Sequence, residues 1–394
     1  MWFSDFTLVL EDRLVPHGSL RVEAGRIAEI VERPVPGGVP GAGLHLLPGL
    51  VDMHGDMIEI ELEPRPGVDM PMEMAVHQLD MRLAASGVTT GYAAVSFSRG
   101  AKDGARRSYE HTSRAIRGVA AARGALRIDH RIHARFDITF ENAVEVLREL
   151  VDDGIVDMVS LMDHTPGQGQ YRDIERHIEQ VARMDGVDIE DARRFVEAKV
   201  ARGTKPEAVL LANLQEVSEL CRSHGVAMAS HDDDSAKKVA LMSDMGVVMS
   251  EFPVVMEAAE AAAGAGMMVA MGAPNALRGG SYSGNLSARD AHRAGLLHIL
   301  AADYHPGAIL PAVKILSETD PGGLPGAVRL ATGNPAEALG LADRGRLEVG
   351  LRADLALVDF SGIGRCVASF SGERLAYSNG SLAFAERAPE AIAV

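Results

Sequence analysis

Short apolar runs alternate with helix-periodic segments through the middle of the chain, from about residue 46 to about residue 303. The run Val156–Met162 has the Val, Leu and Met of a buried strand, and the segment Glu141–Asp152 before it repeats apolar residues at helical spacing. Eight such units follow one another along the sequence. Because strands that alternate with helices build a parallel sheet, the pattern predicts an α/β fold, a (β/α)8 TIM-like barrel.

Both ends of the chain show the two-residue alternation of β-strands instead. Residues 1–45 contain the apolar run Phe6–Leu10 and a predicted hairpin, and the segment after residue 345 alternates again. We expect the two ends to pair with each other. The predicted organisation is a small β-sandwich domain from residues 1–45 plus 345–394, beside a barrel over residues 46–344.

An insertion at residues 168–205 interrupts the strand and helix pattern after the fourth predicted strand. It contains two charged helical stretches, Asp173–Arg183 and Ile189–Ala201. Because loops after barrel strands lie over the barrel mouth, the insertion is expected there. A lid over the substrate and a contact between subunits fit the pattern equally well.

Candidate metal ligands gather at the predicted strand ends, where barrel enzymes place their chemistry. The first strand, predicted over Leu46–Asp56, ends with His54 and Asp56, which share one face of the strand and can aim at one point. Imidazole nitrogen and carboxylate oxygen suit zinc or a similar divalent ion, although such a pair also occurs by chance. The other predicted strand ends carry His133 to Asp137, Asp163, His164, His231 to Asp234, Glu251, Asn275 and Asp303.

The charge balance is strongly acidic, with 39 Lys and Arg against 55 Asp and Glu and a net charge of −16. Such a chain is a poor binder of nucleic acid and of anionic membranes, although a local cation or a metal still allows an anionic small-molecule substrate. Two distant cysteines, Cys221 and Cys366, exclude a disulfide framework and favour the reducing cytoplasm. The N-terminus lacks the pattern of a secretory signal, and no uncharged apolar run reaches the length of about 18 residues that a membrane span needs.

The sequence resembles the amidohydrolase superfamily in Leu47–His54, His231, Asp303 and Gly345–Leu355. Within that superfamily it resembles the PhnM family of diphosphatases over nearly the whole chain. The motifs that carry this resemblance are Ser160–Gln168, Ala229–Asp233, Glu251–Pro253, Met271–Asn275, Arg278–Asn285 and Ala302–Tyr304.

The resemblance implies a reaction and a metal. The family hydrolyses alpha-D-ribose 1-methylphosphonate 5-triphosphate to the 5-phosphate and pyrophosphate in phosphonate catabolism. One or two divalent ions are expected, zinc first, with Mn, Fe or Mg as alternatives. Asp303 is expected to be the catalytic proton acceptor. The metal ligands that the resemblance implies are His54, Asp56, Asp137, His164, His231, Glu251 and Asp303.

Several of these roles have alternatives. Asp137 is a candidate bridge between two ions where other members use a carbamylated Lys, and His133 and Asp163 are alternatives to it. Asp303 is otherwise a helix cap, and His231 is otherwise a core histidine. The acidic run after His231 is expected either to orient that ring or to cap the next helix.

The predicted substrate contacts are polar residues in two loops. A polyphosphate needs cationic or amide donors, which the glycine-rich segment from Arg278 supplies, unless it is an ordinary flexible loop. Arg65 lies soon after the first strand and is otherwise part of a surface turn. The predicted substrate-binding residues are Arg65, Asn275, Arg278, Ser281, Ser283 and Asn285.

The sequence departs from the PhnM pattern at Gly55, where Thr is usual, and in the more apolar Met57–Ile60. These departures leave open a paralogue with another phosphorylated or carboxylated substrate. Two further alternatives are a C–N hydrolase, such as a cyclic amidase or deaminase, and a scaffold without metals. Buried ligand residues argue against the scaffold, because unpaired buried charges are costly. Homo-oligomers are common in the superfamily, so we expect one here.

Overall fold

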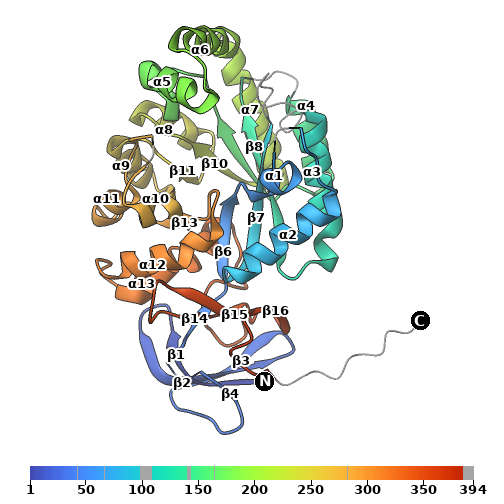
Figure 1. Ribbon diagram of the computed structural model, residues 1–394, viewed down its shortest axis with the longest axis vertical. Helices are drawn as coiled ribbons and strands as arrows, with labels where there is room; N and C mark the ends of the chain where they lie inside the picture. The colour runs from blue at the N-terminus through green and yellow to red at the C-terminus, as the bar shows by residue number, and fades with distance from the viewer. Residues whose placement is uncertain are drawn as a thin grey trace, which may run out of the picture.

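The structure is a computed structural model of the 394-residue chain. It describes residues 1–41, 43–65, 67–97, 109–139, 143–163, 165–281 and 283–384, apart from the side chains at positions 109, 110, 143 and 202. A barrel occupies the upper part of the molecule in Figure 1, and the strands of both chain ends lie together below it.

The barrel strands confirm the predicted parallel sheet. Among the described residues, eight strands pair in sequence order, each parallel to the next. The first and last strands meet through a parallel bridge between Gly55 and Asp303, where Asp303 N–H donates to the His54 carbonyl at 2.8 Å. The strands are β6 (Leu50–Gly55), β7 (Val88–Phe97), β8 (Asp129–Asp137), β9 (Met158–Met162), β10 (Ala227–His231), β11 (Met249–Glu251), β12 (Met268–Gly272) and β13 (Ile299–Ala301).

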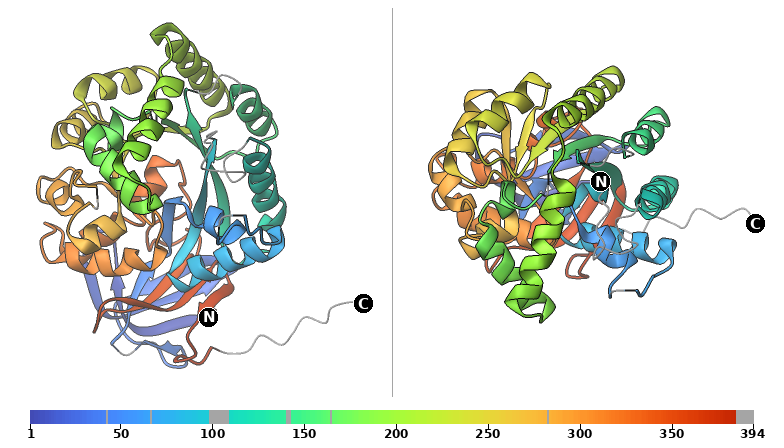
Figure 2. Two further views of the ribbon diagram at one scale, coloured as in Figure 1. Left: turned by 45° about the horizontal axis from the view of Figure 1, so that its top comes forward. Right: turned by 90° about the horizontal axis from the view of Figure 1, so that it is seen from above.

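Helices surround the barrel, as the view from above in Figure 2 shows, and their apolar faces pack on it. In the second helix after the first barrel strand, α2 (Met72–Ala85), the buried residues Ala75, Leu79 and Leu83 recur every four positions. The helices are α1 (Met57–Leu62), α2 (Met72–Ala85), α3 (Tyr109–Ala122), α4 (Ala143–Asp152), α7 (Glu207–His224), α8 (Ala236–Asp244), α9 (Met256–Gly264), α10 (Ala273–Arg278), α11 (Ala288–Arg293), α12 (Ile309–Ser317), α13 (Gly323–Arg329) and α14 (Gly333–Ala338).

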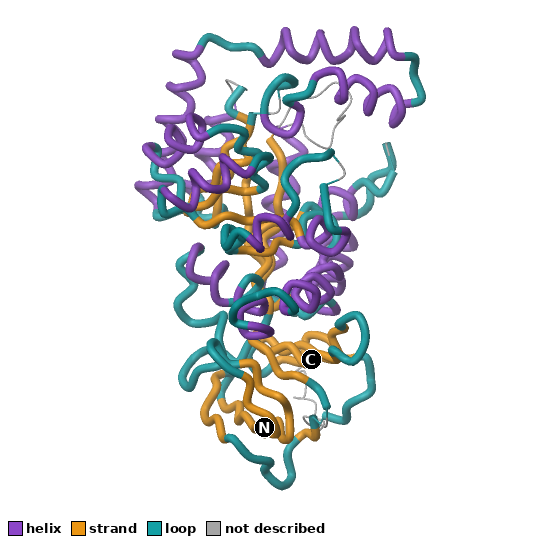
Figure 3. The backbone as a smooth tube through the Cα atoms, turned by 90° about the vertical axis from the view of Figure 1, so that its left-hand side faces the viewer, coloured by secondary structure: helices purple, strands orange, loops and turns teal. Residues whose placement is uncertain are grey.

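The strands of the two chain ends form one continuous mixed sheet in the described part of the chain. The sheet folds over on itself, so that its two halves face each other as the layers of a sandwich do: the rings of Phe3 and Phe370 lie 5.1 Å apart across it. Figure 3 shows these strands together at one end of the molecule. They are β1 (Trp2–Val9), β2 (Leu14–Glu23), β3 (Arg26–Val31), β4 (Val39–Pro40), β5 (His45–Pro48), β14 (Leu355–Asp359), β15 (Arg365–Ser371) and β16 (Arg374–Ser378).

The single strand predicted over Leu46–Asp56 is wrong as one element. The run divides at Gly49 into β5, which belongs to the terminal sheet, and β6, which opens the barrel. A Cβ at position 49 would overlap the Thr89 side chain, and the Gly49 N–H donates to the Asp354 carbonyl at 2.7 Å. Glycine therefore allows the chain to pass between the two sheets at close quarters.

The insertion contains the two predicted helices, α5 (Ile174–Asp185) and α6 (Ile189–Gly203). Each begins at an Asp whose carboxylate accepts the N–H three residues on, and α5 ends at Gly186 with φ +64°. The pair lies at the end of the barrel remote from the terminal sheet (Figure 1) and has a small apolar core of its own. Lid and subunit contact remain alternative predictions for it.

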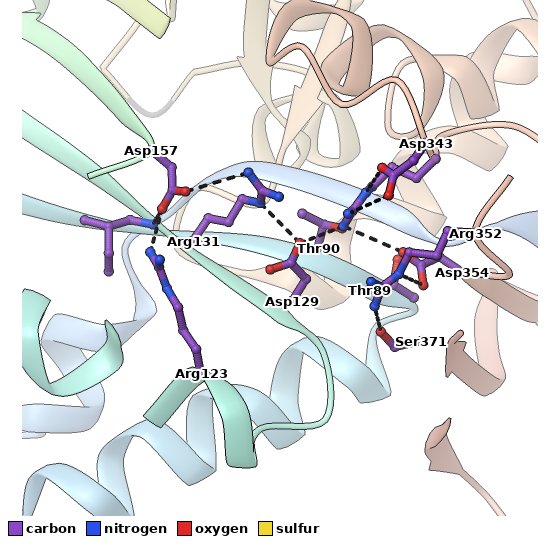
Figure 4. A network of polar contacts seen from close by, with 12 residues as sticks. Thr89, Thr90, Arg123, Asp129, Arg131, Asp157, Asp343, Arg352, Asp354 and Ser371 are labelled. Atoms are coloured by element: carbon purple, nitrogen blue, oxygen red, sulfur yellow. Dashed lines mark hydrogen bonds and ion pairs between the residues drawn. The ribbon is translucent and has the colours of Figure 1, made fainter. Parts of the chain in front are cut away.

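Buried charges connect the barrel to the terminal sheet at the other end of the barrel strands (Figure 4). The Arg344 guanidinium donates to Asp129 Oδ2 at 2.7 Å and to Thr90 Oγ1 at 2.8 Å, and Arg352 donates to Asp354 at 2.7 Å. Both cysteines are free and buried. In the described part of the chain, no helix is both long and apolar enough to cross a membrane.

Candidate metal centre

Three buried side chains meet inside the barrel near the ends of its strands. Among the described residues, His54 on β6, His133 on β8 and Glu251 on β11 each offer a ligand atom within 4.8 Å of the others. All three are at most 1% exposed. Two imidazoles and one carboxylate are a donor set that zinc sites use, with the remaining position open to water or substrate.

The local hydrogen bonds fix the tautomer of His133. Its Nδ1 lies 3.1 Å from the Met53 carbonyl oxygen, which only accepts, so Nδ1 carries the proton. The Nε2 lone pair is then left to face Ser160 Oγ at 2.9 Å and Glu251 Oε2 at 3.8 Å. Burial lowers the pKa of His133 to about 3, which keeps the ring neutral. A neutral imidazole with a fixed tautomer is the form that ligates a metal.

Glu251 provides the test of whether a cation fits. Its Oε1 lies 3.1 Å from His54 Nδ1, whereas its buried Oε2 has no hydrogen-bond partner among the described residues. Burial alone would raise its pKa, but the neighbouring His54 ring, which is positively charged between its two carboxylates, lowers it, so the carboxylate is ionised. An ionised buried oxygen without a donor is costly. A divalent ion held by Glu251 and the two histidines would satisfy this oxygen, so the residues fit a metal.

His54 lies between two carboxylates. Its Nδ1 faces Glu251, and its Nε2 is 3.3 Å from Asp56 Oδ1. Burial would lower its pKa, but Glu251 and Asp56 raise it to about 10. The predicted residues His54, Asp56 and Glu251 are therefore brought together. Ligation by each of them remains a prediction.

Arg135 also belongs to this centre. It lies two residues after His133 on β8, is 5% exposed, and donates from one terminal nitrogen to Asp56 Oδ1 at 2.7 Å. It belongs to the predicted strand end from His133 to Asp137 but was given no role there, although the two-residue period of a strand places Arg135 and His133 on one face. Ser160 begins one of the motifs of the family resemblance and was likewise given no role. His133 itself was named only as an alternative to Asp137.

His231 ends β10 close to the same centre, with its ring 5.5 Å from the His54 ring. The acidic residues after it make different contacts. The Asp232 carboxylate lies 3.0 Å from His231 Nδ1, and Asp233 accepts from Ser230 and Ser250. The expectation that this run orients the ring is thus consistent with the contacts. The expectation that it caps the next helix is wrong, because Ser235 is the residue that caps α8.

Asp303 follows the last strand and is partly buried. Its backbone bonds to both His54 and Asp56 across the barrel closure, so its position relative to β6 is fixed. Burial and the neighbouring Asp56 carboxylate raise its pKa to about 7. A carboxylate with a pKa close to neutral is suited to accept a proton.

Three residues at strand ends have the left-handed backbone conformation. Asp232, Phe252 and Asp303 have φ values of +55°, +56° and +55°. Non-glycine residues pay for this conformation, and such strain gathers at functional sites. At Phe252 it brings the ring within 4.9 Å of the His54 ring and 5.3 Å of the His231 ring, so the ring forms an apolar wall of the centre.

The predicted ligands Asp137 and Asp163 make contacts outside the group of His54, His133 and Glu251. Asp137 Oδ1 accepts from the N–H and hydroxyl of Thr139, at 3.0 and 2.6 Å, and is not in the group formed by His54, His133 and Glu251. Asp163 accepts from Thr165 N–H at 2.9 Å. His164 lies outside the described residues. The roles of Asp137 and His164 as ligands remain predictions.

Among the predicted substrate residues, Asn275 and Arg278 lie in helix α10, and the others lie in loops. Asn275 holds the segment after α10 in place, because its amide donates to the Leu286 carbonyl and accepts from Ala288 N–H, both at 3.0 Å. Ser281 Oγ accepts from Ser283 N–H, and Asn285 is partly buried nearby in sequence. Arg278 and Arg65 are exposed. Contact of each with a substrate remains a prediction.

Comparison with solved structures shows the fold. A 5-methylcytosine deaminase from Klebsiella pneumoniae has a TM-score of 0.66 at 15% identity, covering 99% of this chain and 100% of that one. An N-acetyl-D-glucosamine-6-phosphate deacetylase from Mycobacterium smegmatis has a TM-score of 0.63 at 15% identity, covering 96% and 99%. The chain shares the overall fold of both enzymes.

The family follows from the sequence comparison. The alpha-D-ribose 1-methylphosphonate 5-triphosphate diphosphatase of Escherichia coli (strain K12) is 38% identical over 366 residues, which cover 91% of this chain and 94% of that enzyme. The chain therefore belongs to the PhnM family of diphosphatases. A scan against models of protein families gave no match.

Proposed function

We propose that this protein hydrolyses alpha-D-ribose 1-methylphosphonate 5-triphosphate to the 5-phosphate and pyrophosphate. The proposal rests on the buried group of His54, His133 and Glu251 beside Asp303, together with the family that the sequence comparison identifies. His54, His133 and Glu251 would hold a divalent ion, for which zinc is our choice because two imidazoles and a carboxylate suit it. When bound, such an ion polarises a phosphoryl oxygen and lowers the pKa of the attacking water.

The side chains of the protein supply proton transfer and orientation. With a pKa raised to about 7, Asp303 takes a proton from the attacking water. The water oxygen bonds to the α-phosphorus, and the bond from that phosphorus to the oxygen that bridges to the β-phosphorus breaks. Pyrophosphate leaves with that bridging oxygen, and the ribosyl 5-phosphate remains.

A second metal position and the triphosphate contacts complete the proposal. Asp56 and His231 lie beside His54, and Asp137 and His164 follow neighbouring strands, so these four residues are the candidates for a second ion. The exposed Arg278, with Ser281, Ser283 and Asn285 after it, is the proposed binding segment for the terminal phosphates. We also propose that the protein is cytoplasmic and forms a homo-oligomer. Light scattering of the purified protein tests the oligomeric state.

Pyrophosphate release provides the test of this function. The purified protein is assayed with the ribose triphosphate as isolated, after chelation, and after zinc is restored. We expect release, its loss on chelation and its recovery with zinc. A protein that contains metal, leaves the triphosphate intact and opens a cyclic amide would instead be a C–N hydrolase. An intact triphosphate and an intact amide would indicate a paralogue with another substrate.

A further inference from the structure

Arg135 has a place in the centre that the metal and Asp303 do not explain. Its strand, β8, is separated from β6 by β7, and its side chain crosses this distance to meet Asp56 at the end of β6. The side chain is buried to the same degree as the core around it. A buried guanidinium is retained only where its charge and donors are used.

The Asp56 carboxylate accepts a hydrogen bond from only one of the donors of the Arg135 guanidinium. A guanidinium has five N–H donors, and among the described residues the bond from one terminal nitrogen to Asp56 is its hydrogen bond to the protein. The Arg135 Nε is buried and has no partner in the part of the chain that the structure describes. An arginine whose only role was to hold Asp56 would match the carboxylate with two parallel bonds. The remaining N–H donors of the Arg135 guanidinium are therefore available to an acceptor on a bound substrate.

The surrounding charges indicate what that acceptor is. The Arg135 charge interacts with the carboxylates of Asp56, Glu59 and Glu251, which raise its pKa despite burial. Glu59 lies in α1, where it accepts from Ser96 N–H, and Glu251 ends β11, with its Oε1 3.1 Å from His54 Nδ1. These carboxylates would repel a polyanionic substrate at this position unless a cation of the protein lay between them and the substrate. Arg135 is a cation of this kind at the edge of the metal group, and its planar donors match a phosphoryl group.

We propose that Arg135 is a catalytic residue that donates hydrogen bonds to a nonbridging phosphoryl oxygen of the substrate, next to the phosphorus under attack. This inference rests on the proposed function and adds a residue to it. In phosphoryl transfer the equatorial oxygens bear the charge of the transition state, and a positioned arginine stabilises it. Arg135 forms no covalent bond: the water proton goes to Asp303, and the electrons of the broken bond leave with pyrophosphate.

The test uses four single variants of the zinc-loaded protein and the double variant that combines Arg135→Gln with Asp56→Asn. Arg135→Gln removes the charge, Arg135→Lys keeps the charge but not the fork, and Asp56→Asn removes the partner. Arg148→Gln is the matched control, because Arg148 is an exposed arginine that pairs with Glu216 on the outside of the barrel. Two quantities are measured: kcat for the ribose triphosphate, and the affinity for inorganic pyrophosphate by titration calorimetry.

We expect Arg135→Gln to lower kcat on the order of 10²–10³-fold, the cost of removing one transition-state donor, while Arg148→Gln leaves kcat unchanged. Added guanidinium should restore part of the lost rate of Arg135→Gln. Arg135→Lys should also be slow, because a point charge lacks the planar donors. If Arg135→Gln does not fold, as judged by circular dichroism, the lysine variant provides the test.

Two outcomes would overturn the inference. One is wild-type kcat and wild-type pyrophosphate affinity in the Arg135 variants. The other is a loss of kcat that equals that of Asp56→Asn, is not increased in the double variant, and leaves pyrophosphate affinity unchanged, since Arg135 would then only position Asp56. If the wild-type protein leaves the triphosphate intact, the proposed function fails. The pyrophosphate affinity of the Arg135 variants still decides the inference in that case.

Discussion

Glu251 is the residue that determines the charge balance of the metal centre. Its carboxylate is ionised while fully buried, because the charged His54 ring beside it lowers its pKa. One oxygen is directed to His54, and the other faces His133 without a hydrogen bond. A divalent ion at this point would satisfy both Glu251 and the Nε2 lone pair of His133. The centre thus depends on a residue from β11, the sixth barrel strand.

Replacement of Glu251 provides the first prediction. Glu251→Gln should weaken zinc binding by more than the roughly 10–100-fold that loss of an outer-shell partner costs. Asp137→Asn should retain the zinc ion of the His54, His133 and Glu251 group, because Asp137 is outside that group and its Oδ1 accepts from Thr139. Zinc content after dialysis, measured by atomic emission, checks both. Loss of one equivalent in Asp137→Asn would favour the bridging role predicted from the sequence.

The proton acceptor provides the second prediction. Asp303→Asn should lower turnover on the order of 10²–10⁴-fold, the contribution of a positioned general base. Its zinc content should stay close to that of the wild-type protein, since His54, His133 and Glu251 are intact. Turnover and zinc content are measured on the same preparation. Retained turnover would remove Asp303 from the proton transfer.

At single positions the sequence predicts the centre well where a motif and a strand end coincide. His54 and Glu251 follow from strand ends, and the structure brings them together. His133 and Asp137 share a strand and a face, so their sequence positions alone do not decide between them. The contact between Arg135 and Asp56 could not be predicted from the sequence positions, because it depends on β8 lying two strands from β6 in a closed barrel.

At the scale of elements, Gly49 separates two sheets that the hydrophobic pattern joins. The apolar run continues through the junction because both strands are buried, so the pattern contains no sign of the change of sheet. The backbone at Gly49 approaches the Thr89 side chain too closely for any Cβ. The prediction from the pattern therefore fails where a contact distant in sequence decides the structure.

This close approach predicts the cost of a small substitution. Gly49→Ala should lower the free energy of unfolding by about 1–3 kcal/mol, the typical cost of overpacking. Gly124→Ala is the matched control, because the space around Gly124 is open. Urea unfolding of both variants measures the difference. Equal stability of the two variants would contradict the importance of this junction.

Asp80 joins helix α2 to the strand β8 that carries His133. Its buried carboxylate accepts from Arg127 N–H and from His130 Nε2, both at 3.0 Å, and these bonds lower its pKa although burial opposes them. A lowered pKa means that the stabilisation is complete above the unfolded value of about 3.9 and is lost as the pH falls through the folded value.

Asp80→Asn should therefore lower the free energy of unfolding by about 2 kcal/mol near neutral pH, the contribution of bonds to a charged acceptor. The difference from the wild-type protein should be constant above about pH 5 and should narrow below about pH 4. Urea unfolding across this range measures it. A difference independent of pH would show that the Asp80 charge is not the cause.

At the scale of the whole molecule, buried ion pairs fix the barrel to the terminal sheet. Arg344 reaches both Asp129 at the start of β8 and the Thr90 hydroxyl on β7, while its neighbour Asp354 borders the terminal sheet. The metal centre lies at the opposite ends of these strands, so this network concerns stability rather than chemistry. Separation of the two ends of the strands is general in barrel enzymes.

Arg344→Met should cost about 1–3 kcal/mol of unfolding free energy, because the buried Thr90 hydroxyl and the Asp129 carboxylate each lose a donor, although Asp129 keeps its pair with Arg131. Arg346→Gln, in an exposed pair with Glu348, is the control and should cost less than about 1 kcal/mol. Thermal unfolding compares the two variants. Similar melting temperatures would show that the network does not stabilise the contact between the barrel and the terminal sheet.

The central claim is that water attacks the α-phosphorus of a ribose 5-triphosphate and releases pyrophosphate. Phosphorus NMR of the zinc-loaded protein with its 1-methylphosphonate substrate, in water enriched in heavy oxygen, tests it directly. The account predicts pyrophosphate and a 5-monophosphate as the two products, with the heavy oxygen in the 5-monophosphate. Orthophosphate, heavy oxygen in the pyrophosphate, or an unchanged triphosphate with zinc bound would contradict it.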